Sequence, residues 1–321
     1  MRTFNTFSNL LDQGYWFSDN RVSAFASQST GGLNQIDYHG KQPVSHNAKI
    51  FQSNDGVIRF SLLVKRDAIT EEEPLRFGKV KIYPYGFINS CSCLGCDCTL
   101  AMTLYRKALI FRLSVENRTG KALETAPRVK FNIASQSTEV HGNRKWDEPK
   151  LLKGRGVLFR ARDQIPLAEW VEKKGDYLVN EYWQKKIFTV KTTPEGETIK
   201  ELKPRYKRSN LMLYDAEIYA VAGGESSQQA RLLNGWVEFE SKLQSGSPRF
   251  ESRPSVFVLA LGDSKKEVTR NYRTAVQQSV RLERSQRKRY DQVGRRVPTL
   301  RLRGYPEIEE LFRVTPQVVE S

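Results

Sequence analysis

The sequence predicts a mainly β protein: a large antiparallel β-supersandwich followed by a C-terminal helical linker. Short runs in which apolar and polar side chains alternate recur along most of the 321 residues, as expected of half-buried strands. Gly and Pro lie between these runs and mark turns. A long helical pattern comes only at the end, which excludes the repeated strand-helix alternation of a parallel sheet. We expect the β-supersandwich domain over residues 1–262 and the helical linker over 263–321.

Most of the expected strands are short alternating runs. They cover residues 22–26, 33–38, 57–64, 80–82, 100–104, 109–115, 129–133, 211–214, 218–222, 236–239 and 256–261. A polar loop, Ser18-Asp19-Asn20, is expected before the first of them, and an acidic turn at Glu71–Pro74. Residues 135–208 mix aromatic and charged side chains without clean runs. We interpret that stretch as a long excursion between sheets.

The helix has a clear start signal. Ser264 followed by Glu267 fits a capping box, in which the hydroxyl and the carboxylate each accept a hydrogen bond from free backbone N–H groups. The remaining signals are a predicted apolar stripe and a glycine stop. They are Val268, Tyr272, Val276, Val280 and Gly294.

The charge of the chain is concentrated in this helical segment. Residues 264–304 hold thirteen Lys or Arg against three acidic residues, so they contribute +10 of the formal net charge of +16. A row of basic side chains can neutralise phosphates, which makes nucleic-acid binding one interpretation. The other is a solvated or domain-facing helix. We favour the second, because no nucleic-acid motif accompanies the charge and Tyr272 and Tyr290 are the only aromatic residues of the helix. Nucleic acid is therefore not an expected partner.

The compartment follows from two features. The N-terminal residues lack an apolar run of signal-peptide length, and no stretch approaches the roughly 20 apolar residues that a membrane span needs. We expect a cytoplasmic protein without a membrane partner. The four cysteines would then be thiols or metal ligands rather than structural disulfides.

The cysteines form one tight cluster, Cys91, Cys93, Cys96 and Cys98. If Leu94-Gly95 is a hairpin tip, Cys91 and Cys93 share a face of one strand, and Cys96 and Cys98 share a face of the next. Four thiolates could then converge on one zinc ion, but a tight hairpin leaves little room for a tetrahedral site. The two alternatives are a loop of free thiols, which we favour, and a zinc site. Zinc at these cysteines is the one cofactor that the sequence suggests.

The sequence shows no clear pattern for a histidine-based site, a phosphate loop or a catalytic carboxylate pair. The three histidines, His39, His46 and His141, are too scattered for a metal or nucleophile constellation, and Gly223-Gly224 lacks the surroundings of a phosphate loop. The sequence also does not single out a carboxylate pair for glycoside cleavage.

Five aromatic side chains are candidates for carbohydrate contact, because flat rings suit the apolar faces of sugars. They are Tyr15, Trp16, Trp146, Trp170 and Trp183. Trp16 is the strongest candidate, since Ser18, Asp19 and Asn20 beside it could hydrogen-bond hydroxyl groups. Most tryptophans serve in cores or interfaces instead.

With these residues in view, the chain resembles the N-terminal region of the six-hairpin glycosidases, enzymes with an (α/α)6 barrel that include glucoamylase-like, debranching-type and sugar-phosphorylase families. Features at the two ends of the chain carry the resemblance. They are Trp16–Asn20, Gly31-Gly32-Leu33, the run Val256–Leu261 that closes on Gly262-Asp263, the helix start Ser264–Val268, and Tyr305–Phe312 leading to Pro316.

The resemblance implies a β-supersandwich, then a helical linker, then the start of a catalytic barrel that this sequence lacks. The acid and base carboxylates of these enzymes lie in the barrel, so no catalytic residue is assigned here. The expected function is a non-catalytic β-sandwich portion of a carbohydrate-active enzyme, possibly of glucan-debranching or glucosidase type. It would pack on an (α/α)6 catalytic domain, in cis or as a separate chain, and contact an oligo- or polysaccharide. The alternatives are a basic nucleic-acid-binding protein that uses the 264–304 helix and a metal-dependent module built on the cysteines.

Overall fold

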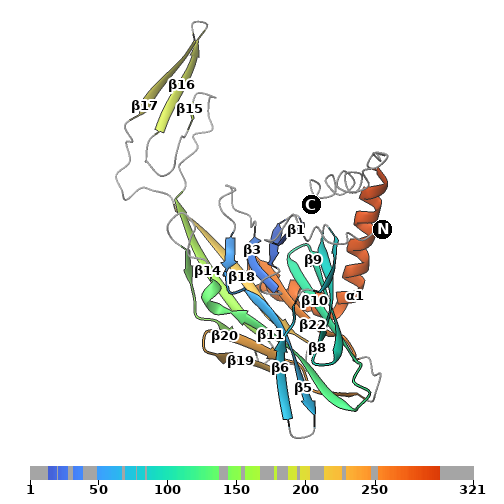
Figure 1. Ribbon diagram of the computed structural model, residues 1–321. Coiled ribbons are helices and arrows are strands. Elements are labelled where there is room, and N and C mark those ends of the chain that lie inside the picture. The colour runs from blue at the N-terminus through green and yellow to red at the C-terminus, as the bar shows by residue number, and fades with distance from the viewer. Residues whose placement is uncertain are drawn as a thin grey trace. The chain divides into compact units, whose positions relative to one another are not determined.

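The computed structural model describes most of the chain. The described residues are 14–19, 21–27, 32–38, 49–66, 69–76, 78–83, 85–136, 144–152, 156–166, 177–178, 187–193, 196–202, 213–225, 229–246 and 252–296. The chain forms two compact units, one of residues 1–161 with 217–321 and one of residues 162–216. The first unit is a mainly β sandwich, and one long helix follows its last strand in sequence (Figure 1). This architecture confirms the predicted fold class.

The first sheet of the sandwich has ten strands. Along its main path these are β1 (Tyr15–Asp19), β2 (Val22–Ser27), β3 (Gly32–Tyr38), β5 (Ile58–Arg66), β11 (Leu123–Asn132), β20 (Trp236–Glu240) and β19 (Gln229–Leu233). Three more strands pair at its sides: β4 (Lys49–Gln52) with β3, β6 (Ile69–Pro74) with β5, and β21 (Gln244–Gly246) with β11. A short 3-10 helix, Ile133–Ser135, follows β11.

The second sheet has nine strands. Its path is β12 (Arg144–Trp146), β14 (Gly156–Pro166), β18 (Leu213–Gly224), β22 (Ser255–Gly262), β10 (Ala108–Asn117), β9 (Cys96–Tyr105), β8 (Gly86–Cys93) and β7 (Lys79–Tyr83), with β13 (Lys150–Leu151) beside β14. The second unit holds a separate antiparallel sheet of three strands. These are β15 (Tyr177–Leu178), β16 (Ile187–Thr193) and β17 (Gly196–Leu202).

Alternating side chains of the two large sheets meet in one core. Phe60 of the first sheet packs on Phe111 of the second with ring centroids 5.1 Å apart, and Phe17 packs on Phe87 at 5.6 Å. All four rings are buried. Burial of apolar surface of this kind is the main force that holds sandwich layers together.

The helix α1 (Lys265–Arg296) covers the second sheet. Val268, Ala275 and Leu282 are buried in a second apolar cluster with residues of β10 and β22. Figure 1 shows the helix beside these strands. The run Val256–Leu261 is therefore buried on both faces, because alternate residues enter the core and the layer under the helix. This double burial explains why its sequence is continuously apolar.

Several local expectations were wrong. Ser18 and Asp19 belong to strand β1 instead of a loop, and the acidic stretch Glu71–Pro74 lies in strand β6 instead of a turn. The charges of β6 are tolerated in a strand because Glu72 accepts hydrogen bonds from Arg128 and Ser61. Gly294 does not end the helix, which continues to Arg296.

Candidate carbohydrate-binding face

The outward face of the first sheet carries an aromatic pair, of which Trp16 is exposed and Phe25 is partly buried. Trp16 of β1 lies directly opposite Phe25 of β2, with ring centroids 5.2 Å apart and planes tilted by 42°. Trp16 is 55% exposed. It points outward because its strand neighbours Tyr15 and Phe17 are buried, and successive side chains of a strand point to opposite faces.

A polar row lies beside this pair on the same face. The strand register places Ser18, Ser23 and Asp37 side by side across β1, β2 and β3. The Ser23 hydroxyl donates to Asp37 Oδ2 at 3.3 Å, and Gln35 Nε2 donates to Asp37 Oδ1 at 2.9 Å. These side chains are partly exposed. We call the six residues Trp16, Ser18, Ser23, Phe25, Gln35 and Asp37 the Trp16 face.

The chemistry of the Trp16 face suits a sugar. An exposed indole offers a flat apolar surface, and hydroxyl, amide and carboxylate groups beside it can exchange hydrogen bonds with hydroxyl groups. Only Trp16, Ser18 and the strand pattern around them could be picked out from the sequence. Phe25, Gln35 and Asp37 join it through strand register, which a single sequence does not reveal.

Asp19 lies elsewhere. Its side chain is 1% exposed and points away from the Trp16 face. Its oxygens accept from the Arg106 backbone N–H at 2.6 Å, from Gln286 Nε2 at 2.8 Å and from Arg289 Nη1 at 2.8 Å. In this structure Asp19 therefore joins α1 to the sandwich and has no surface exposed to a ligand.

The other aromatic candidates differ in placement. Trp146 is partly buried and packs on Phe51, with ring centroids 5.2 Å apart. Asn20, Trp170 and Trp183 lie outside the described residues, as do the three histidines.

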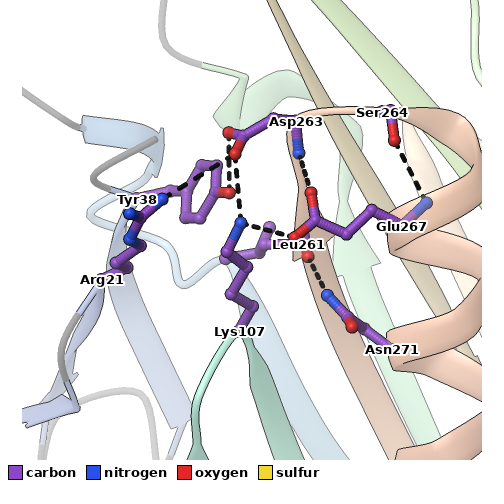
Figure 2. Close-up of polar contacts among 8 residues, drawn as sticks. All are labelled: Arg21, Tyr38, Lys107, Leu261, Asp263, Ser264, Glu267 and Asn271. Atoms are coloured by element: carbon purple, nitrogen blue, oxygen red, sulfur yellow. Dashed lines mark hydrogen bonds and ion pairs between the residues drawn. The ribbon is translucent and has the colours of Figure 1, made fainter. Parts of the chain in front are cut away.

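A second polar cluster lies at the start of α1. Figure 2 shows side chains from the end of β3, from two hairpin turns and from the start of the helix pointing toward one another. Tyr38 donates to Asp263 Oδ1 at 2.8 Å, and Lys107 Nζ contacts Asp263 at 3.1 Å and Glu267 at 2.7 Å. Arg21 approaches Asp263 at 3.9 Å. The cluster thus joins both sheets to the first turn of the helix.

The predicted capping box is confirmed within this cluster. The Glu267 N–H donates to Ser264 Oγ at 3.2 Å, and the Glu267 carboxylate accepts from the Asp263 N–H at 2.8 Å (Figure 2). Gly262 is required here, because an added Cβ would lie 2.9 Å from the Val268 backbone nitrogen.

Electrostatics in the cluster match a structural role. Burial raises the pKa of Tyr38, and the neighbouring Asp263 carboxylate raises it further. Burial also raises the pKa of Glu267, but the hydrogen bonds from Lys107 and from the Asp263 N–H outweigh it and hold that pKa below its usual value. Neutral Tyr38 and charged Glu267 are therefore the stable forms, and each is engaged in hydrogen bonds or ion pairs within the cluster.

The cysteines lie where the hairpin prediction placed them. Leu94 and Gly95 form the tip, with positive φ values of 49° and 76°. In the register of the two strands Cys91 lies opposite Cys98, and Cys93 lies opposite Cys96. All four are free thiols. Burial raises the pKa of each, to about 12 for Cys93. No group of three or more His, Cys, Asp or Glu in the described part of the chain is arranged to hold a metal ion.

No helix among the described residues is both long and apolar enough to span a bilayer.

Together these observations define an antiparallel two-sheet sandwich, braced by one helix, with an aromatic and polar patch on its first sheet. No protein-family model matches the sequence, and no curated protein matches it.

Solved structures with a similar arrangement include three whose names refer to sugar chemistry. A polysaccharide lyase is 8% identical (TM-score 0.44), with 78% of this chain and 34% of that chain covered. A galactose mutarotase related enzyme from Lactobacillus acidophilus is 9% identical (TM-score 0.36), with 79% and 99% covered. A bacterial glucoamylase in complex with acarbose is 8% identical (TM-score 0.33), with 99% and 40% covered.

The chain thus spans about a third of the polysaccharide lyase and 40% of the glucoamylase. Similarities of this degree are too weak to assign an activity to it.

Proposed function

We propose that this chain is a non-catalytic, carbohydrate-binding β-sandwich portion of a carbohydrate-active enzyme. The observation that carries the proposal is the exposed Trp16, paired with Phe25 and flanked by the hydrogen-bonding row of Ser23, Gln35 and Asp37. An oligosaccharide would stack one ring on the indole and exchange hydrogen bonds with the row.

The non-catalytic part of the proposal rests on how the acidic groups are used. Asp19, Asp263 and Glu267 are each engaged in contacts that fix the helix to the sheets. Asp37 is accessible, but its two hydrogen bonds come from residues of the same face, which suits binding more than proton transfer to a substrate. In the resembling enzymes the acid and base lie in an (α/α)6 barrel, and we propose such a domain, in cis or as a separate chain, as the partner.

Sugar binding is tested by calorimetric titration of the 321-residue chain with maltoheptaose. Trp16→Ala should weaken binding by about tenfold or more, because a stacked aromatic contact contributes roughly 1.5 kcal/mol. The matched control is Leu232→Ala, which removes a side chain that is 56% exposed on another strand and should leave affinity unchanged. Equal affinity of the wild type and Trp16→Ala would remove the Trp16 face from the proposal.

The catalytic assignment has its own test. Incubation of maltoheptaose with the purified chain should release no product. Turnover that disappears on Asp37→Asn would contradict the non-catalytic assignment.

A further inference from the structure

A row of basic side chains, interrupted once between Arg273 and Arg281, runs along the face of α1 that points away from the sandwich. Its members follow one another at intervals of three or four residues, apart from the step that Gln277 fills. They are Lys266, Arg270, Arg273, Arg281, Arg284 and Lys288, all exposed. Residues at these intervals lie on one side of a helix. We call these six residues the basic row.

The row is opposite the buried side of the helix. Val268, Ala275 and Leu282 are buried against the second sheet, and each lies about half a turn from a member of the row. Two of the three acidic residues of α1 are paired outside the row: Glu267 with Lys107, and Glu283 with Arg112 at 3.0 Å. The third, Asp291, lies three residues beyond Lys288, at the end of the row. Within the described residues, none of the six members forms an ion pair.

Hydrogen bonds to the sheets hold the helix, and with it the row, in place. Asp19 accepts hydrogen bonds from Gln286 and Arg289 of the helix. Tyr272 donates to the Gly224 carbonyl at 2.8 Å, and Asn271 donates to the Leu261 carbonyl at 2.9 Å. With 1.5 Å of rise per residue, the six charges span roughly 33 Å, with one break in helical geometry at Gln278. A fixed line of cations that is fully solvated costs self-repulsion, which a polymer with repeated anionic groups would relieve.

The surroundings of the row narrow the kind of polymer. Single-stranded nucleic acid is bound through aromatic side chains on which bases stack, and none of the exposed residues of α1 is aromatic. Sequence-specific readout of a duplex places a helix inside its groove, whereas α1 lies flat on a nine-stranded sheet. Only phosphate contacts would therefore remain for a duplex. An anionic lipid surface would favour an apolar flank, but the apolar side of α1 is buried.

We propose that the basic row binds an acidic polysaccharide, whose carboxylate or sulfate groups pair with the arginines and lysines. Guanidinium groups suit this task because they bind planar carboxylates through paired hydrogen bonds. The polysaccharide nature of the ligand rests on the proposed function. The anionic character rests on the basic row alone.

The experiment measures binding of polygalacturonate to the full chain at two salt concentrations. A fourfold variant, R270Q/R273Q/R281Q/R284Q, removes the centre of the row. The control, K79Q/K81Q/K121Q/K145Q, removes the same charge from exposed lysines elsewhere on the sandwich. Circular dichroism verifies that both variants are folded. The row variant should bind at least about tenfold more weakly, with a shallower salt dependence, and the control should bind within about twofold of the wild type.

Three results would overturn the inference: no binding of polygalacturonate by the wild type, equal losses in both variants, or tighter binding of duplex DNA than of polygalacturonate at the same salt. The last result would favour a nucleic-acid surface instead. Failure of the proposal that the Trp16 face binds sugar can be distinguished from failure of this inference. In that case maltoheptaose binding would not depend on Trp16, while polygalacturonate binding to the basic row would remain.

Discussion

Asp19 is a polar residue close in sequence to the exposed Trp16, yet its side chain is buried and binds the helix α1. Its neighbours in sequence suggested a solvent-facing loop, but its partners Gln286 and Arg289 lie 267 and 270 residues away. A single sequence offers no signal for contacts at that separation. The buried position became evident only once the strand β1 and the helix were placed together.

Replacing Asp19 should destabilise the protein strongly. Asp19→Ala leaves the Arg106 N–H and Gln286 Nε2 without their acceptor, which should lower the free energy of unfolding by about 3 kcal/mol. The control is Asp97→Ala, which breaks the exposed Arg118 pair and should cost at most about 1 kcal/mol. Urea unfolding of both variants measures the difference, and equal losses would refute the anchoring role of Asp19.

Glu267 predicts a pH dependence. Its pKa is lower in the folded chain than the ordinary 4.5, so the stability that its charge contributes is fully present above pH 4.5 and is lost as the pH falls through the folded pKa. Glu267→Gln should therefore be less stable than the wild type at pH 7, and the difference should shrink as the pH falls below 4.5. Urea unfolding across pH 3–7 measures this, and a difference that stays constant over the range would contradict it.

At the scale of elements, the helix shows both what periodicity predicts and where it fails. Its start and capping box were predictable from residues 264–268, and its general amphipathic character from the stripe over residues 268–280. The predicted stripe used a strict four-residue spacing, which drifts around a helix of 3.6 residues per turn. Val280 is therefore 44% exposed, whereas Ala275 and Leu282 are buried.

The tip of the cysteine hairpin, Leu94-Gly95, was predicted correctly, and both residues have the positive φ that a tight two-residue turn needs. Strand β6 was not, because a run of three glutamates is rare in strands. Glu72 is held there by Ser61, Arg128 and Lys130, which come from two neighbouring strands. Such compensation depends on sheet order, and sheet order cannot be derived from alternation alone.

At the scale of the whole molecule, alternation predicted the sandwich but not which strands pair. The first sheet joins β3 to β5 and β5 to β11, and the second places β22 between β10 and β18. These neighbours come from distant parts of the chain. The Trp16 face lies instead on β1, β2 and β3, which follow one another along the chain, and it depends on their register, including the shift between Phe25 and Ala26. Only Trp16 and Ser18 among its six residues could therefore be named from the sequence.

The packing of α1 predicts that helix and sandwich open together. Native-state hydrogen exchange should give the buried turns of α1, around Val268, Ala275 and Leu282, the same opening free energy as β22. A helix that exchanges at a clearly lower free energy than β22 would instead support an independent linker that begins at residue 263.

The central claim is that the first sheet binds sugar through Trp16. The most direct measurement is an NMR titration of the chain with maltoheptaose, which follows the indole N–H signals of Trp16 and Trp236. The account predicts a saturable shift of the Trp16 signal and of backbone amides in β1–β3, with Trp236 unchanged. Shifts confined to other parts of the chain, or none at saturating sugar, would contradict it.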